Sequence, residues 1–206
     1  MTNPETSSPE TTNPEPQDPR FGFAAVTEAV GALIDSVEVQ DPPKLNAPTP
    51  CPKFTVDILL DHVVMVMRRV AVLGNGGHWS EIDQESLGSG WAADYRSAAH
   101  DIMAAWTDAA KLEQTFEVPW GEFPGGLILY TYTAELAVHG WDLATATGLD
   151  FTVADDHLHG ALEAAMFIPA DDRGSEDMPF SQVVVPGPDV PVLVQIAGWL
   201  GRYVSS

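Results

Sequence analysis

Residues 127–148, with the sequence LILYTYTAELAVHGWDLATATG, form the stretch that decides the fold of this chain. Apolar side chains fall on several sides of its helical wheel, which is typical of a helix surrounded by other elements. These apolar residues include Leu127, Leu129, Tyr130, Leu136, Val138 and Leu143. Gly148 stands where a left-handed residue commonly ends a helix. We therefore predict one long, buried helix over this stretch.

Three polar side chains share one face of that helix. At about 100° per residue, His139 lies about 40° from Glu135, and Asp142 lies about 60° back from His139. A carboxylate and an imidazole four residues apart can bind one metal ion, with the second carboxylate within reach of either. The alternative is a simple side-chain pair of Glu135 and His139 on a solvated face, worth about 0.3 kcal/mol. A third ligand from elsewhere in the chain would favour the metal site.

His62 is the candidate for that third ligand. It lies in residues 56–73, an almost wholly apolar stretch that predicts a second helix, with Thr55 placed to cap its N-terminus. A lone histidine in an apolar helix is more often a core residue satisfied by one hydrogen bond. His62 becomes a metal ligand only if its helix packs against residues 127–148. Both interpretations stay open at this point.

The remaining pattern is mainly helical. Residues 115–124 combine alternation with turn residues, which indicates a short hairpin or an extended loop. The other predicted elements are helices over residues 21–39, 90–112, 155–167 and 190–203, and a short strand over 183–185. We therefore expect a single helical domain over residues 21–206.

Residues 1–20 differ in composition from everything that follows. They carry five prolines and four acids, and no apolar residue after Met1. Such a segment cannot bury enough surface to offset the entropy lost on ordering. We expect a disordered, acidic, proline-rich tail that contributes nothing to the fold.

The composition also narrows the class of protein. The 206 residues, 45% of them hydrophobic, suffice for a core of ordinary size, but no run approaches the roughly 18 apolar residues of a membrane helix. The N-terminus lacks a signal-peptide pattern, so we expect a cytoplasmic protein. Cys51 is the only cysteine, which excludes an intramolecular disulfide and a thiolate zinc cluster. The net charge of −21 argues against nucleic acid and anionic membranes as partners.

Two motifs carry a resemblance to a known family. Residues 49–62 read T-P-C-P-x-[aromatic]-T-V-x-x-L-L-x-H, and residues 135–148 read E-L-A-V-H-G-W-D-L-A-x-A-x-G. Together with a W-G-E-F-P-G loop at 120–125 and a closing L-G-R at 200–202, this pattern resembles the mycothiol-dependent maleylpyruvate isomerase family. That family belongs to the DinB-like superfamily of metal-binding helical bundles. The resemblance spans most of residues 21–206.

The resemblance implies a fold and a site. The expected fold is all-α, a DinB-like up-down four-helix bundle with short accessory helices and a small hairpin. The implied site is a divalent metal, zinc in the first instance, bound by His62, Glu135 and His139. Asp142 matches the acidic position that the family associates with activity, where it would orient a ligand histidine or handle a proton. Three protein ligands and an open position are typical of catalytic zinc.

The resemblance also implies a chemistry. We expect mycothiol or another low-molecular-weight thiol as cosubstrate, transferred to a small electrophile or assisting its isomerisation. Arg202 or Arg96 would meet a substrate carboxylate. The rival hypothesis is a non-catalytic module that binds a metal or a small molecule, because metal ligands do not specify a reaction. A purely structural bundle is a third hypothesis, and both a monomer and a homodimer stay open.

Two features set this chain apart from the family pattern, and a third position, Cys51, leaves its role open. Lys53 and Phe54 stand where members commonly have Gly-Trp. Only about sixty residues follow Gly148, so we expect a short, actinobacterial-type member without the separate C-terminal domain of the characterised isomerase. Cys51 precedes His62 in the first motif, and we interpret it as a packed small residue, with a role near the metal as the alternative.

Overall fold

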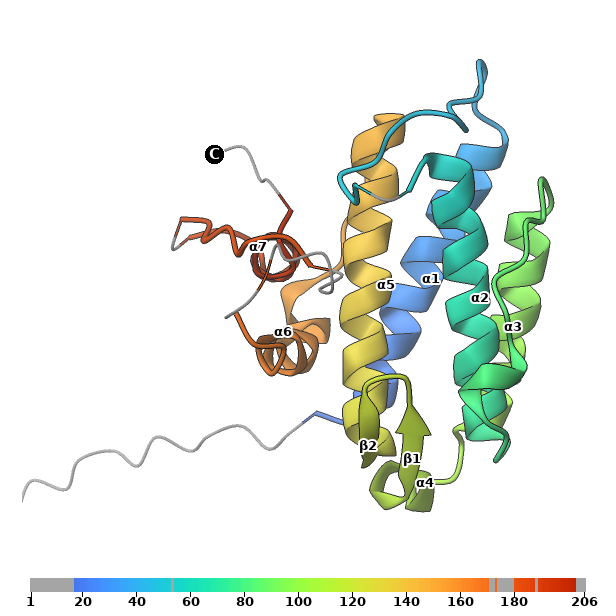
Figure 1. The fold of residues 1–206 in the computed structure, drawn as a ribbon, viewed down its shortest axis with the longest axis vertical. Helices are drawn as coiled ribbons and strands as arrows, with labels where there is room; N and C mark the ends of the chain where they lie inside the picture. The colour runs from blue at the N-terminus through green and yellow to red at the C-terminus, as the bar shows by residue number, and fades with distance from the viewer. Residues whose placement is uncertain (1–16, 53, 171–172, 174–179, 188, 203–206) are drawn as a thin grey trace, which may run out of the picture.

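Four long helices form the body of the described chain (Figure 1). The computed structural model describes residues 17–52, 54–170, 173, 180–187 and 189–202. The long helices are α1 (Pro19–Glu38), α2 (Val56–Gly74), α3 (Trp91–Ala105) and α5 (Gly125–Thr147). The short elements are η1 (Trp79–Glu81), α4 (Ala110–Glu113), β1 (Thr115–Val118), β2 (Gly121–Pro124), η2 (Asp155–His157), α6 (His159–Met166) and α7 (Val192–Trp199). The predicted all-α class with a small hairpin is confirmed.

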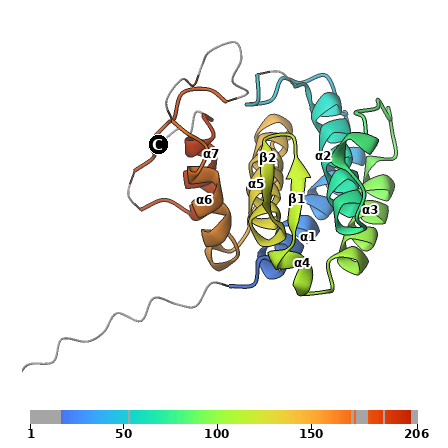
Figure 2. The same cartoon turned by 60° about the horizontal axis from the view of Figure 1, so that its bottom comes forward.

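The predicted central helix is α5, and it is buried as its composition requires. It packs against α1 and α2 on one side, and α6 and α7 cover its other side (Figure 2). Leu136 and Leu143 are fully buried, and burying each such side chain stabilises the fold by about 1.5–3 kcal/mol. Gly148 ends the helix with a φ of 74°, a left-handed conformation that glycine adopts without steric cost.

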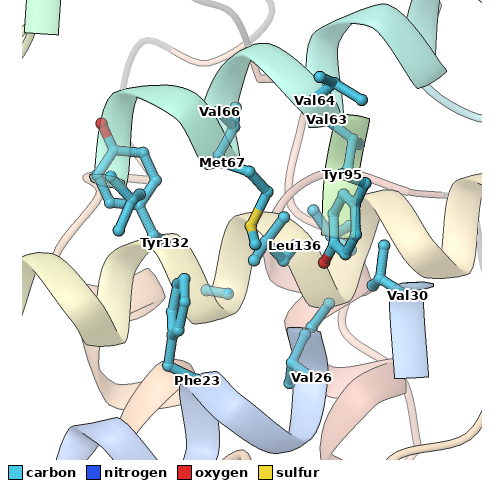
Figure 3. Packing of buried hydrophobic residues seen from close by; sticks show 14 of the residues in the cluster. Phe23, Val26, Val30, Val63, Val64, Val66, Met67, Tyr95, Tyr132 and Leu136 are labelled. Carbon is cyan, nitrogen blue, oxygen red and sulfur yellow. The ribbon is translucent and has the colours of Figure 1, made fainter. Parts of the chain in front are cut away.

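The core lies where the four long helices meet. Buried side chains from all of them interdigitate, among them Phe23, Val26, Val30, Val63, Met67, Tyr95 and Leu136 (Figure 3). Helix α1 contacts α3 and α5, and α2 also contacts α3 and α5, so the helices close into a ring. The periodic apolar residues of each helix form one face directed into this ring.

The helix directions differ from the alternating up-down order that we expected. Trp91 at the start of α3 donates a hydrogen bond of 2.6 Å to Asp61 near the start of α2. Trp106, just past the end of α3, donates one of 3.0 Å to the carbonyl of Val70 near the end of α2. Helices α2 and α3 are therefore parallel. Residues 75–90 make this possible, since such a connection can span about 50 Å, more than the roughly 22 Å length of α3.

The first helix begins two residues before the predicted start at Phe21. Asp18 caps it by accepting a hydrogen bond of 3.0 Å from the backbone of Arg20, and Arg20 donates one of 2.9 Å to the carbonyl of Thr107. Residues 18–20 are thus part of the helical domain and not of the expected tail. Residues 1–16 lie outside the described chain.

Several predicted boundaries shift for local reasons. The helix predicted over 90–112 is interrupted after Ala105, and Asp108 accepts a hydrogen bond from the backbone of Ala110 at the start of the separate turn α4. The helix predicted over 155–167 is divided into η2 and α6, and the last helix ends at Trp199. The strand predicted over 183–185 is wrong, because that segment lies outside the named strands and pairs through Val184 with α7. The hairpin is confirmed, with Phe116 opposite Phe123.

None of the helices in the described ranges has the length and apolar character needed to cross a membrane.

Asp61 tests the parallel packing of α2 and α3. It is buried and accepts hydrogen bonds from the Trp91 ring and from the backbone of Leu87 at 3.0 Å. Asp61→Ala leaves one buried and one partly buried donor without an acceptor, so we expect the free energy of unfolding to fall by about 2–4 kcal/mol. Urea denaturation measures this. Asp57→Ala on the same helix is the control and should cost less than about 1 kcal/mol; equal losses would contradict the role of Asp61.

Candidate metal centre

The packing of α2 against α5 brings the three predicted ligands together. His62 Nε2 lies 3.1 Å from Glu135 Oε1, and His139 Nε2 lies 3.9 Å from the same oxygen. One ligand atom from each residue lies within 4.8 Å of the other two. Glu135 therefore faces two imidazoles from two helices, which differs from a simple pair with His139 on a solvated face. His62 is likewise not an isolated core histidine.

The donor set fits a divalent ion. Two imidazole nitrogens and one carboxylate oxygen are a common zinc ligand set, with bonds of about 2.0–2.2 Å. Tetrahedral bonds of that length separate the ligand atoms by about 3.3–3.6 Å, and the observed separations bracket this range. The side chains of His139, His62 and Glu135 are 8%, 16% and 29% exposed. The cluster is therefore closed around His139 and opens toward solvent beside Glu135.

The second nitrogen of His139 is held by Asp142. His139 Nδ1 lies 3.1 Å from Asp142 Oδ2, one turn further along α5. When Nδ1 carries the proton and donates a hydrogen bond to this carboxylate, the lone pair of Nε2 is directed at Glu135 and the cluster. Asp142 is completely buried, so it reaches the cluster only through His139. This is the arrangement by which a carboxylate orients a metal-binding histidine.

Arg202 holds Asp142 in turn. Its Nη2 lies 2.8 Å from Asp142 Oδ2 and its Nε lies 3.1 Å from Oδ1, and its Nη1 donates to the carbonyl of Leu200 at 2.9 Å. Such a bidentate pair fixes the plane of the carboxylate. Burial raises the pKa of Asp142, but hydrogen bonds from His139 and Arg202 outweigh it and hold that pKa below its usual range. Asp142 therefore stays ionised.

Arg202 and Arg96 both contact acids of the protein, which differs from the expected contact with a substrate carboxylate. Arg202 was expected to meet a substrate carboxylate, but its guanidinium is buried and engaged by Asp142. Arg96 forms an exposed ion pair with Asp35, on a surface formed by α1 and α3. The closing L-G-R motif marked Arg202 in the sequence. The sequence also marked Asp142, but nothing in it indicated that these two residues, sixty positions apart, form a pair.

The protonation states of the cluster suit metal binding. Burial raises the pKa of Glu135, but the hydrogen bond from His62 and nearby positive charge outweigh it and lower that pKa to about 2. Burial lowers the pKa of His139 more than its bond to Asp142 raises it. Near neutral pH, Glu135 is thus a carboxylate and His139 a neutral imidazole. These are the forms that bind metal ions.

The loop before α2 covers one side of the cluster. The ring of Phe54 lies 5.0 Å from that of His62 and 6.2 Å from that of His139. Phe54 is one of the two residues at which this chain differs from the family pattern, and the other, Lys53, lies outside the described residues. Cys51 is buried and lies close to Arg202. Burial lowers the pKa of Arg202, but the hydrogen bond to Asp142 and the nearby Cys51 raise it above its usual value. The role of Cys51 stays a prediction.

The pair of Arg202 and Asp142 can be tested by stability. Arg202→Gln leaves a buried carboxylate without its charged partner, so we expect the free energy of unfolding to fall by about 3–5 kcal/mol. Because the pKa of Asp142 is lowered in the fold, the contribution of the pair is complete above the ordinary aspartate pKa and is lost as pH falls below it. Chemical denaturation should therefore show that the difference in unfolding free energy between the wild type and Arg202→Gln becomes smaller as the pH falls from neutral to about 3.

A second variant isolates the pair itself. The double variant Arg202→Gln/Asp142→Asn removes both charges, so it should lose less stability than the sum of the two single variants. Additive losses would show that the two side chains do not stabilise each other.

Comparison with known proteins identifies the family of this chain. Residues 25–144 match the family model described as the mycothiol maleylpyruvate isomerase N-terminal domain, a range that includes His62, Glu135, His139 and Asp142. Two relatives from Mycobacterium tuberculosis, in the strains CDC 1551 / Oshkosh and ATCC 25618 / H37Rv, are each 30% identical over 192 residues. The alignments cover 91% of this chain and 99% of each relative, and both relatives are named as uncharacterized proteins. No solved structure matches. The chain belongs to the mycothiol maleylpyruvate isomerase N-terminal domain family.

Proposed function

We propose that this protein binds one divalent metal ion, zinc in the first instance, through His62, Glu135 and His139, and uses it in the chemistry of a small thiol. The observation that carries the proposal is the approach of three ligand atoms, from two helices, to within 4.8 Å of one another. The family description names mycothiol, which makes a low-molecular-weight thiol the class of cosubstrate. The reaction is transfer of the thiol to a small electrophile, or thiol-assisted isomerisation of that electrophile.

Three of these residues would bind the metal ion, and Phe54 would shield it from water. A bound metal with an open position supplies a Lewis acid that lowers the pKa of a coordinating thiol. His62 and Glu135 hold the ion from opposite helices, and His139 completes the set of three protein ligands. Phe54 excludes water on the side of the two imidazoles. Thiol and electrophile approach beside Glu135, whose side chain is the most exposed of the three.

Asp142 acts through His139. Because its carboxylate is fully buried and already accepts from His139 and Arg202, it has no path to a substrate proton. It keeps His139 in the tautomer and orientation that present Nε2 to the metal. Of the two roles predicted for this residue, orientation of a ligand histidine is the one that the geometry supports.

The metal assignment can be tested by composition. Purified full-length protein should contain about one equivalent of a divalent metal by elemental analysis, because three ligands converge on one point. The variants His62→Ala, Glu135→Ala and His139→Ala should each lose most of it. His100→Ala, at an exposed position on α3, is the matched control and should keep it. Equal metal content in all five proteins would refute the assignment.

The chemistry can be tested through Asp142. Asp142→Asn keeps an oxygen for His139 but loses the charge that orients it, so we expect metal content to persist and thiol-dependent turnover to fall about ten- to a hundredfold. The assay is thiol consumption by metal-loaded protein over a panel of electrophiles, with metal-free protein as control. Loss of metal in Asp142→Asn would show that the orientation of His139 by Asp142 is needed for metal binding itself. Thiol binding without any rate above the metal-free control would favour the non-catalytic module.

A further inference from the structure

A cavity separate from the candidate metal centre lies at the end of the bundle where α1 and α5 begin and α3 ends. Its volume is about 230 Å³. None of the side chains that line it belongs to the metal centre. Most of the lining is apolar and comes from Phe23, Ile102, Met103, Trp106 and Leu129. Met103 is the exposed member of this set, so the cavity opens to solvent beside it.

Trp106 is a rigid wall of this cavity. Its indole N–H donates a hydrogen bond of 3.0 Å to the carbonyl of Val70, and its ring lies 5.2 Å from that of Phe116. Two glycines pack directly against the indole, since a Cβ at Gly74 or Gly125 would lie 2.4 Å or 2.8 Å from its atoms. These contacts fix the ring in place. The cavity is therefore preformed, as small-molecule sites usually are.

Arg20 closes one side of the cavity with its charge already neutralised. Its Nε and Nη2 donate hydrogen bonds of 3.0 Å and 2.5 Å to the carboxylate of Asp18, and its Nη1 donates one of 2.9 Å to the carbonyl of Thr107. These partners occupy the edges of the guanidinium plane. The flat face remains, and the face of a guanidinium stacks well on an aromatic ring.

The remaining polar group of the lining is also satisfied. Thr107 donates from Oγ1 to the carbonyl of Ala104 at 3.0 Å, and its own carbonyl accepts from Arg20. A water molecule in a cavity needs about two to four polar partners, and apolar cavities without them stay dry. This lining therefore favours an apolar ligand over water.

We propose that this cavity binds a small, neutral aromatic molecule of one or two rings. An apolar cavity of about 150 Å³ is enough for benzene, so about 230 Å³ leaves room for a substituent or a fused ring. The rings of Phe23 and Trp106 and the sulfur of Met103 make favourable contacts with an aromatic ligand. The ligand is neutral because Asp18 already pairs with Arg20 and because the net charge of −21 repels anions.

The probes are indole and benzyl alcohol, with cyclohexanemethanol as the saturated analogue and benzenesulfonate as the charged one. Binding to the full-length protein is followed by NMR of its methionine methyl groups. After allowance for each probe's own transfer from water to octanol, benzyl alcohol should bind at least about fivefold more tightly than cyclohexanemethanol, because the aromatic contacts favour it. Benzenesulfonate should bind at least about tenfold more weakly than benzyl alcohol, because its charge would lose water without gaining a partner.

Two methionines in the same spectrum locate the site. Met103 and Met166 are 54% and 52% exposed, but Met166 lies on α6, outside the cavity. The ring current of a bound aromatic probe should shift the methyl signal of Met103 and leave that of Met166 unchanged. Met103→Trp places a large side chain at the opening and should weaken indole binding at least about tenfold. Met166→Trp is the matched control and should bind indole as the wild type does.

Four results would overturn the proposal. The first is the absence of any shift of the Met103 methyl with millimolar indole or benzyl alcohol. The second is equal binding of the aromatic probe and its saturated analogue after the same allowance. The third is equal binding of benzyl alcohol and benzenesulfonate. The fourth is unchanged indole binding in Met103→Trp, with a melting curve that shows the variant to be folded.

Discussion

The structure depends on the burial of most of α5. A helix with apolar side chains all round must be covered on every side, which α1 and α2 do from one direction and α6 and α7 from the other. This requirement brings segments from both ends of the chain to one helix. It also places the polar groups of α5 in the interior, where each needs a partner. The candidate metal centre and the Asp142–Arg202 pair provide such partners for Glu135, His139 and Asp142.

The polar groups form one connected chain of interactions. His62 contacts Glu135, Glu135 faces His139, His139 contacts Asp142, and Arg202 completes the series. A buried carboxylate without a partner would cost several kcal/mol, so Arg202 is required once Asp142 is buried. The C-terminal segment after α7 is therefore more than a cover for α5. It supplies the charge that keeps Asp142 ionised and so keeps His139 oriented.

The parallel packing of α2 and α3 requires a long connection between them. Because residues 75–90 return along the bundle, the connection after α2 passes beside that helix, and its Trp79 and Ile82 hold Arg69. The hairpin after α4 then places Trp120 against Tyr132. The connection after α2 and the hairpin thus lie against α2 and α5 at Arg69 and Tyr132. A strictly alternating bundle would lack the long return and with it the anchor of Arg69.

Local patterns in the sequence were sufficient to predict the main helices and the part of the site that lies on α5. The periodicity of residues 127–148 and the glycine after them predict α5, and helical spacing alone places Glu135, His139 and Asp142 on one face. These properties depend on neighbours within a few residues, which is why the sequence contains them. The same holds for the hairpin, where turn residues and alternation are adjacent.

Only the tertiary structure decided which distant side chains meet. The approach of His62 to Glu135, the pairing of Arg202 with Asp142 and the direction of α3 each join residues far apart in the sequence. Such contacts follow from how whole helices pack and how long connections run, and no local periodicity encodes them. His62 could equally have been a core histidine, and Arg202 a substrate ligand, until the packing of α5 brought each to its partner.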